Sequence, residues 1–169
     1  MSSSLNMMGL GDDQMASQYG IVFPEGIPGG GNAENITLRM DQQFDPPEDN
    51  TTMYEIIFRG MKIPKTSMTH EMTKEAIIMV RIDQTWEIYK DLIAWSHKCY
   101  DPINGTALPD SMVRTTMLVQ MYDGQGKVVQ TFRFRGTKLK GLKVETLDNA
   151  SADPLRVTLN FIFNDMISE

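Results

Sequence analysis

The chain has 169 residues, enough for one domain with its own core, and its apolar content of 41% is ordinary for a globular protein. No apolar run approaches the roughly 20 residues of a membrane helix, and residues 1–10 lack the basic and apolar regions of a secretory signal, so we expect no membrane anchor. The net charge of −6 disfavours general nucleic-acid binding, which depends on neutralising phosphates.

The acidic charge is concentrated at the front of the chain. Residues 1–52 carry eight acidic side chains and one basic side chain, whereas residues 53–169 are nearly balanced. Residues 1–35 are also rich in glycine and serine, so they bury too little apolar surface to fold alone. We predict an irregular, acidic and Gly-rich N-terminal arm over residues 1–35. Its apolar patch of Ile21, Val22 and Phe23 is expected to dock onto a neighbouring subunit.

From residue 36 onward, many apolar residues alternate with polar ones, which is the pattern of half-buried β-strands. The alternation predicts strands near residues 36–40, 54–58 and 76–82, and the Pro-rich segment 45–50 predicts a loop. We interpret residues 60–73 as a second loop, rich in methionine. A flexible thioether suits adaptable interfaces, so we expect this loop to contact another subunit through its apolar residues Met61, Ile63, Met68 and Met72.

One segment in the middle of the chain has the period of a helix. Ile88, Leu92, Trp95 and Cys99 recur at spacings of four, three and four residues, which places them on one stripe. We therefore predict a helix over about residues 85–99 with this stripe buried.

The remainder of the chain again has strand character. Two β-rich runs flank the turn Asp123-Gly124-Gln125-Gly126, which predicts a hairpin, and apolar residues alternate from 155 to 163. We predict a mainly β domain over residues 36–169 with one inserted α-helix. Its antiparallel sheets are expected to form a half-barrel or sandwich.

The sequence offers no catalytic or metal-binding constellation. His70 falls in the predicted loop, His97 lies away from the buried stripe of the helix, and the lone Cys99 continues that stripe. A metal site needs clustered His, Cys or carboxylate ligands. We therefore predict a protein that is not an enzyme and holds no cofactor or metal.

A basic run near the C-terminal end allows three interpretations. No acidic residue lies between Asp123 and Glu145, and this interval contains Arg133, Arg135, Lys138, Lys140 and Lys143. The run could be a solvated face, could bind a phosphate backbone, or could receive the acidic front end of a neighbouring subunit. Complementary charge of the last kind sets register between subunits. We rank it above nucleic-acid binding.

Several features follow one another in the order found in tail tube proteins of contractile-tailed bacteriophages. They are the strand 75–83 ending in an acid, the helix ending Leu92-Ile93-Ala94-Trp95, the Asp-Pro…Gly…Leu-Pro loop 100–109, the hairpin around Gly124–Gly126, the strand end Phe134–Gly136 and the closing strand 157–163. Over roughly residues 36–166 the chain resembles this family, including the related tube-initiator proteins of the baseplate.

The resemblance implies a structural virion protein. Proteins of this family form hexameric rings in which each subunit contributes strands to an inner β-barrel, and the rings stack into a channel for the genome. The implied partners are further copies of the chain, a sheath outside, the baseplate hub or initiator and a terminator at the two ends, and tape measure protein and transient DNA in the lumen. The implied location is the virion tail, assembled in the bacterial cytoplasm. A tube initiator, a terminator cap, an effector-tube protein of a bacterial secretion machine and a nucleic-acid-binding module remain alternatives.

Overall fold

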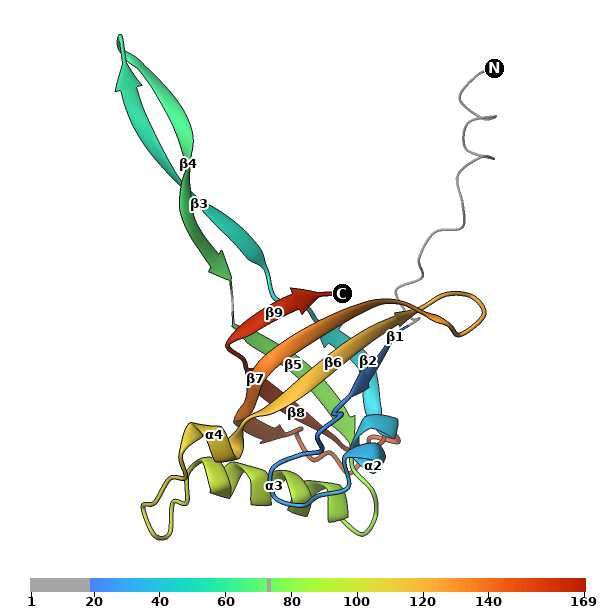
Figure 1. Cartoon of the computed structure of the whole chain (residues 1–169). Helices are drawn as coiled ribbons and strands as arrows, with labels where there is room; N and C mark the ends of the chain where they lie inside the picture. Colours follow the sequence, from blue (N-terminus) through green and yellow to red (C-terminus); the bar gives the residue numbers. More distant parts are fainter. Residues whose placement is uncertain (1–18, 73) are drawn as a thin grey trace, which may run out of the picture.

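The computed structural model describes residues 19–72 and 74–169. Its body is one seven-stranded sheet, in which the path β1-β6-β7-β8-β5-β2 is antiparallel throughout and β9 pairs with β7 (Figure 1). These strands are β1 (Tyr19–Val22), β2 (Met40–Asp45), β5 (Glu75–Arg81), β6 (Thr115–Tyr122), β7 (Val128–Val144), β8 (Arg156–Ile162) and β9 (Asp165–Ser168). The mainly β fold with one long helix is confirmed. The sheet is open, because β1 and β2 form its two ends and do not pair in the described residues.

The sheet turns a corner along β7. The first half of β7 pairs with β6 and β9, and its second half pairs with β8. Gly136 lies at the corner with φ +66°, a conformation that side chains disfavour. Arg114 fastens the corner, since its Nη1 donates to the Gly136 carbonyl at 3.2 Å and to the Asn164 side chain. One chain can therefore supply both walls of a half-barrel.

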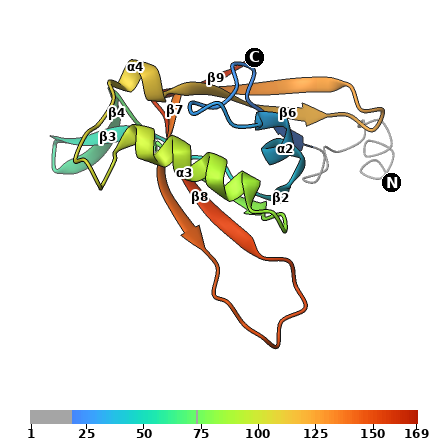
Figure 2. The same cartoon turned by 90° about the horizontal axis from the view of Figure 1, so that it is seen from below.

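Helix α3 (Glu87–Cys99) lies across the lower end of the sheet, beside the short helix α4 (Asp110–Val113) (Figure 2). The predicted stripe is buried, with Ile88, Leu92 and Trp95 at most 1% exposed. The Trp95 Nε1 donates to the Val113 carbonyl at 2.9 Å, and its ring packs against Phe161 of β8. The indole therefore joins helix, sheet and the entry to β6 at one point of the core.

The described part of the predicted N-terminal arm, residues 19–35, begins with a strand and ends in a helix, with turns and irregular backbone between them. Residues 19–22 form edge strand β1, and Ile21, Phe23 and Ile27 are at most 7% exposed. The Phe23 ring meets the Trp95 ring edge-on at 6.2 Å. The apolar residues of this segment cover the chain's own core, which the high glycine content of the segment concealed. Residues 1–18 lie outside the described residues.

The strand predicted near residues 36–40 is wrong, because Ala33–Leu38 form helix α2. Asn32 caps this helix by accepting the Asn35 N–H at 3.1 Å, and Ile36 alone points into the core at 1% exposure, whereas Leu38 is 72% exposed. Three alternating apolar residues are too few to separate a short helix from a strand. The cap residue was the better signal.

The loop predicted over residues 60–73 is also wrong. Residues 61–72 form strand β4 (Met61–Met72), which pairs with β3 (Asp49–Phe58) in a long hairpin. Arg59 and Gly60 both have positive φ and form the two-residue turn, since Phe58 pairs directly with Met61. Pro64 suggested a loop, but a two-stranded ribbon has an outer edge on each strand, where proline is tolerated.

Replacing Gly136 with alanine is expected to destabilise the corner. A Cβ there would stand 2.8 Å from the Asn164 Cγ and in a disfavoured backbone conformation. The cost of at least about 1 kcal/mol lowers the midpoint of thermal unfolding by about 2–4 °C. Gly124→Ala is the matched control, since nothing lies within 4 Å of its added Cβ. Equal midpoints for the two variants would show that the corner does not depend on Gly136.

Candidate assembly surface

The β3–β4 hairpin rises from the end of the sheet body opposite α3 (Figure 1). Along the chain, β3 follows β2 and β4 leads into β5, and Pro46-Pro47 lies between β2 and β3. With 10 residues in β3, it extends about 30 Å. A two-stranded ribbon of this kind is marginally stable alone in water. The hairpin is therefore a segment that a second molecule would stabilise.

The two faces of the hairpin differ in chemistry. The register places Phe58 opposite Met61, Ile56 opposite Ile63 and Tyr54 opposite Lys65, all on one face. On this apolar face Phe58 is 54% exposed and Met61 is 63% exposed. The other face carries the Glu55–Lys62 ion pair, with 3.5 Å between Oε2 and Nζ, between the exposed Met53 and Ile57. An exposed ladder of apolar rungs marks an interaction surface.

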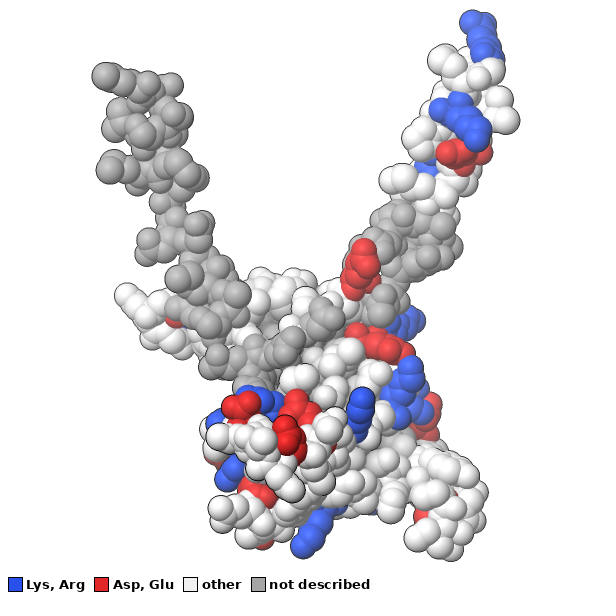
Figure 3. Space-filling view, turned by 180° about the vertical axis from the view of Figure 1, so that it is seen from behind, with Lys and Arg blue, Asp and Glu red and all other residues white. Residues whose placement is uncertain are grey.

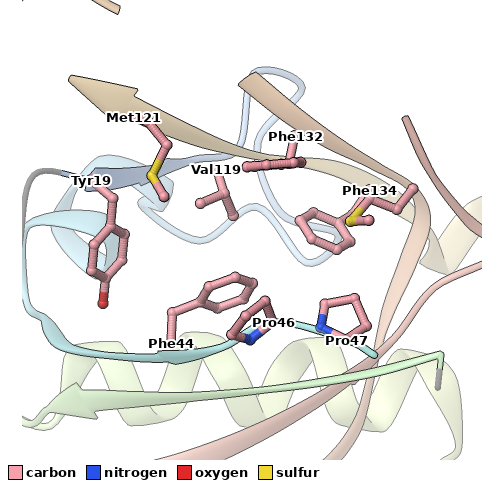
Figure 4. A pocket seen from close by; sticks show the side chains of 9 residues that line it. Tyr19, Phe44, Pro46, Pro47, Val119, Met121, Phe132 and Phe134 are labelled. Carbon is pink, nitrogen blue, oxygen red and sulfur yellow. The ribbon is translucent and has the colours of Figure 1, made fainter. Parts of the chain in front are cut away.

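A cavity of about 400 Å³ lies where the two ends of the sheet approach each other (Figure 4). Tyr19 of β1 and Phe44 of β2 face each other across it with ring centroids 6.4 Å apart, and the Phe44 ring meets the Phe134 ring at 6.0 Å. We call the junction between β1 and β2, the two ends of the sheet, the apolar seam. Side chains alone bridge it, because β1 and β2 form no ladder. Its lining is almost entirely apolar: Tyr19, Phe44, Pro46, Pro47, Val119, Met121, Phe132, Phe134 and Met166.

Within the seven-stranded sheet, three strands leave a backbone edge without a partner strand in the described chain. They are β1, β2 and β9, each of which pairs with a single neighbour. Such edges present N–H and C=O groups that can pair with another chain. The sheet therefore has the means to continue into a second molecule.

Four of the five side chains of the basic run are paired within the chain, and none of the described ion pairs includes Lys143. Arg133 pairs with Glu169 at 3.1 Å and Lys138 with Asp110 at 3.1 Å, while Arg135 pairs with Asp165 and Lys140 with Glu75. The Arg135 guanidinium lowers the pKa of the Asp165 carboxyl, and the hydrogen bond from Lys140 lowers the pKa of Glu75. These exposed pairs add little stability. They do reduce the uncompensated positive charge that phosphate binding needs.

The structure separates the other predicted contact residues. Met61 and Ile63 lie on the apolar face of the hairpin, whereas Ile21 and Phe23 are buried and Val22 is 36% exposed on β1. The side chains of Met68, Met72 and His70 lie outside the described residues. Cys99, which the stripe predicts to be buried, is only half-buried, and this partial burial raises the pKa of its thiol.

Sequence reasoning missed most of the apolar face. Tyr54, Ile56 and Phe58 belong to it together with Met61 and Ile63, and a turn at Arg59-Gly60 would have paired them. Within the described residues, no helix is long and apolar enough to cross a membrane, and no group of three or more His, Cys, Asp or Glu side chains could hold a metal ion.

No known family model and no curated sequence matches the chain, but solved structures match it over its full length. A chain of the sheath–tube complex of the PVC extracellular contractile injection system, in its extended state, is 10% identical and has a TM-score of 0.64, covering 100% of this chain and 98% of that one. A chain of the tube-terminating cap of the anti-feeding prophage is 8% identical with a TM-score of 0.68, covering 100% and 99%.

This chain has the fold of contractile injection system tube and cap proteins. A type six secretion system protein shares it more loosely, at 9% identity and a TM-score of 0.50, covering 89% of this chain and 81% of that one. The resemblance to tail tube proteins that the sequence indicates is confirmed at the level of the fold.

Because four of the five basic side chains are paired, we expect the wild-type protein to pass through a column of immobilised duplex DNA at near-physiological salt. The double variant Asp165→Asn with Glu169→Gln frees Arg133 and Arg135, so its retention should rise. The slope of log affinity against log salt concentration should become steeper by about two, because about two more counterions are released. The control Asp148→Asn with Asp153→Asn changes the net charge equally but lies in the loop between β7 and β8, away from β9. Strong retention of the wild type, released by salt, would restore the nucleic-acid interpretation.

Proposed function

We propose that this chain is a structural subunit of the tube of a contractile, phage-like tail. The observation that carries the proposal is the combination of an open sheet with a long hairpin whose apolar face has no cover in the described chain. Both features are incomplete in a single molecule and are satisfied when copies assemble. The shared fold supports the same role, because it occurs in a sheath–tube complex and in a tube cap.

In this role the unpaired strand edges join neighbouring copies into a ring, and the rings stack into a hollow tube. A barrel that closes in this way abolishes the exposed edges. We propose six subunits per ring, with a sheath outside, an initiator and a terminator at the ends, and tape measure protein and passing DNA inside. The particle is the tail of a bacteriophage virion, assembled in the bacterial cytoplasm, and the chain acts by assembly rather than by catalysis.

A cap that terminates the tube is the second candidate. The observation that favours it is the full-length likeness to the tube-terminating cap, with a TM-score of 0.68. A cap needs one stacking surface, so the purified protein should stop at single rings. A tube subunit should instead form stacks whose length increases with protein concentration. Negative-stain electron microscopy of a concentration series separates these outcomes, and a protein that stays monomeric throughout would contradict both.

The apolar face of the hairpin is expected to be required for stacking. The triple variant Ile56→Thr, Phe58→Thr and Ile63→Thr keeps strand propensity but removes the apolar rungs. Burial of three such side chains contributes several kcal/mol, so the concentration needed for stacks should rise at least about a thousandfold.

The control variant Met53→Thr with Ile57→Thr alters the opposite face of the same hairpin. Both variants should keep the wild-type circular dichroism spectrum and unfolding midpoint, because the hairpin lies outside the core. Normal stacks from the triple variant would remove the apolar face from the assembly.

A further inference from the structure

The hairpin carries surplus positive charge on the part that extends farthest from the body. Residues 53–67 contain three basic side chains and one acidic one, and Glu55 is already paired with Lys62. Arg59 and Lys65 therefore remain as the uncompensated charges. Arg59 is held at the turn with its guanidinium 5.3 Å from the centroid of the Phe58 ring. Figure 3 shows Lys and Arg side chains gathered toward the tip of this hairpin.

The loop between β7 and β8, residues 145–155, has the complementary composition. It carries the acidic residues Glu145, Asp148 and Asp153 and no basic residue. The same loop contains Leu147, whose side chain is 76% exposed. None of these three carboxylates takes part in a salt bridge with another described residue. This loop therefore presents one apolar side chain surrounded by uncompensated negative charge.

Internal hydrogen bonds fix the conformation of this loop in the single chain. The Asp148 Oδ1 accepts the Ala150 N–H at 2.9 Å, and the Asp148 carbonyl accepts the Ser151 N–H at 3.2 Å. The Glu145 N–H donates to the Arg156 carbonyl at 3.1 Å and closes the base of the loop. A preformed loop loses little conformational freedom on binding, which favours its use as a docking element.

Hairpin and loop leave the body in different directions. The hairpin rises from the end opposite α3 in Figure 1, while the loop extends to the side of α3 in Figure 2. They cannot meet within one molecule. A contact between the hairpin of one copy and the loop of the next joins two different surfaces, and contacts of that type generate open stacks when the rotation does not close.

We infer that the apolar face of the β3–β4 hairpin docks on the acidic β7–β8 loop of a second copy of this chain. Leu147 packs against the rungs formed by Phe58 and Ile56, while Arg59 and Lys65 face the carboxylates around it. This contact rests on the proposed function and names the surface that receives the hairpin. Apolar burial holds the contact, and the charges fix its register and direction.

Charge reversal tests this contact. The hairpin variant Arg59→Glu with Lys65→Glu and the loop variant Glu145→Lys with Asp153→Lys should each raise the concentration needed for stacks at least about tenfold. Asp148 stays unchanged because its carboxylate organises the loop. The chain that carries all four changes restores opposite charges at every junction and should stack nearly as well as the wild type. The control Glu55→Lys with Lys62→Glu inverts an ion pair inside the hairpin and should have no effect.

The outcomes separate this contact from the proposed function. Wild-type stacks with unaffected reversal variants, or with no rescue by the fourfold variant, would overturn the contact while leaving the tube role intact. The second of these results would mean that the hairpin docks on another surface. Single rings of the wild type would also overturn it and would favour the cap. A wild-type protein that remains monomeric would overturn both the contact and the tube role.

Discussion

The bend of β7 at Gly136 is the constraint from which the architecture follows. Because this residue adopts φ +66° without the penalty of a side chain, one strand pairs with β6 and β9 before the bend and with β8 after it. Arg114 bridges the Gly136 carbonyl and Asn164, which stands where the chain passes from β8 to β9. Two walls built from one strand enclose the core over α3 yet leave the sheet ends apart. The same bend therefore gives the molecule a stable body and an unfinished barrel.

The body and the hairpin obtain their stability in different ways. In the body, the Phe23 ring meets Trp95 edge to face, and both rings pack at a tilt against Phe161 of β8. In the hairpin the ladder is regular, but its apolar rungs face solvent. Exposed rungs lose the stabilisation that burial provides, and they regain it only when another surface covers them. This separation allows the body to fold as a monomer, while the apolar face of the hairpin stays available for another copy.

The sequence predicts the elements whose pattern is long and local. The spacing of Ile88, Leu92 and Trp95 fits only a helix with one buried face, and the alternation that ends at Phe163 fits only a strand. The failures have a common cause in short or interrupted patterns. Helix α2 offers one buried residue, Ile36, so its period cannot be determined from hydrophobicity.

The surface is harder to predict from sequence than the core. The basic run is contiguous in sequence, but its ion-pair partners come from strands β5 and β9 and from helix α4, which only the folded topology brings together. The apolar face of the hairpin was hidden for the opposite reason. Its rungs depend on the register between Phe58 and Met61, which the turn at Arg59-Gly60 sets, and the methionines and Pro64 of β4 resemble a loop in composition.

The molecule is polar along one direction, and this polarity bears on its place in a tube. The hairpin rises from one end of the body, whereas α3 lies at the other end (Figure 1). When copies stack head to tail, each contact uses one surface from each of two copies. A stack of any length therefore ends with one uncovered surface of each kind. A subunit that terminates such a stack needs only one of the two surfaces. Under the proposed function, the apolar hairpin and the acidic loop are the two surfaces that a subunit in the body of a tube needs, whereas a cap would use only one of them.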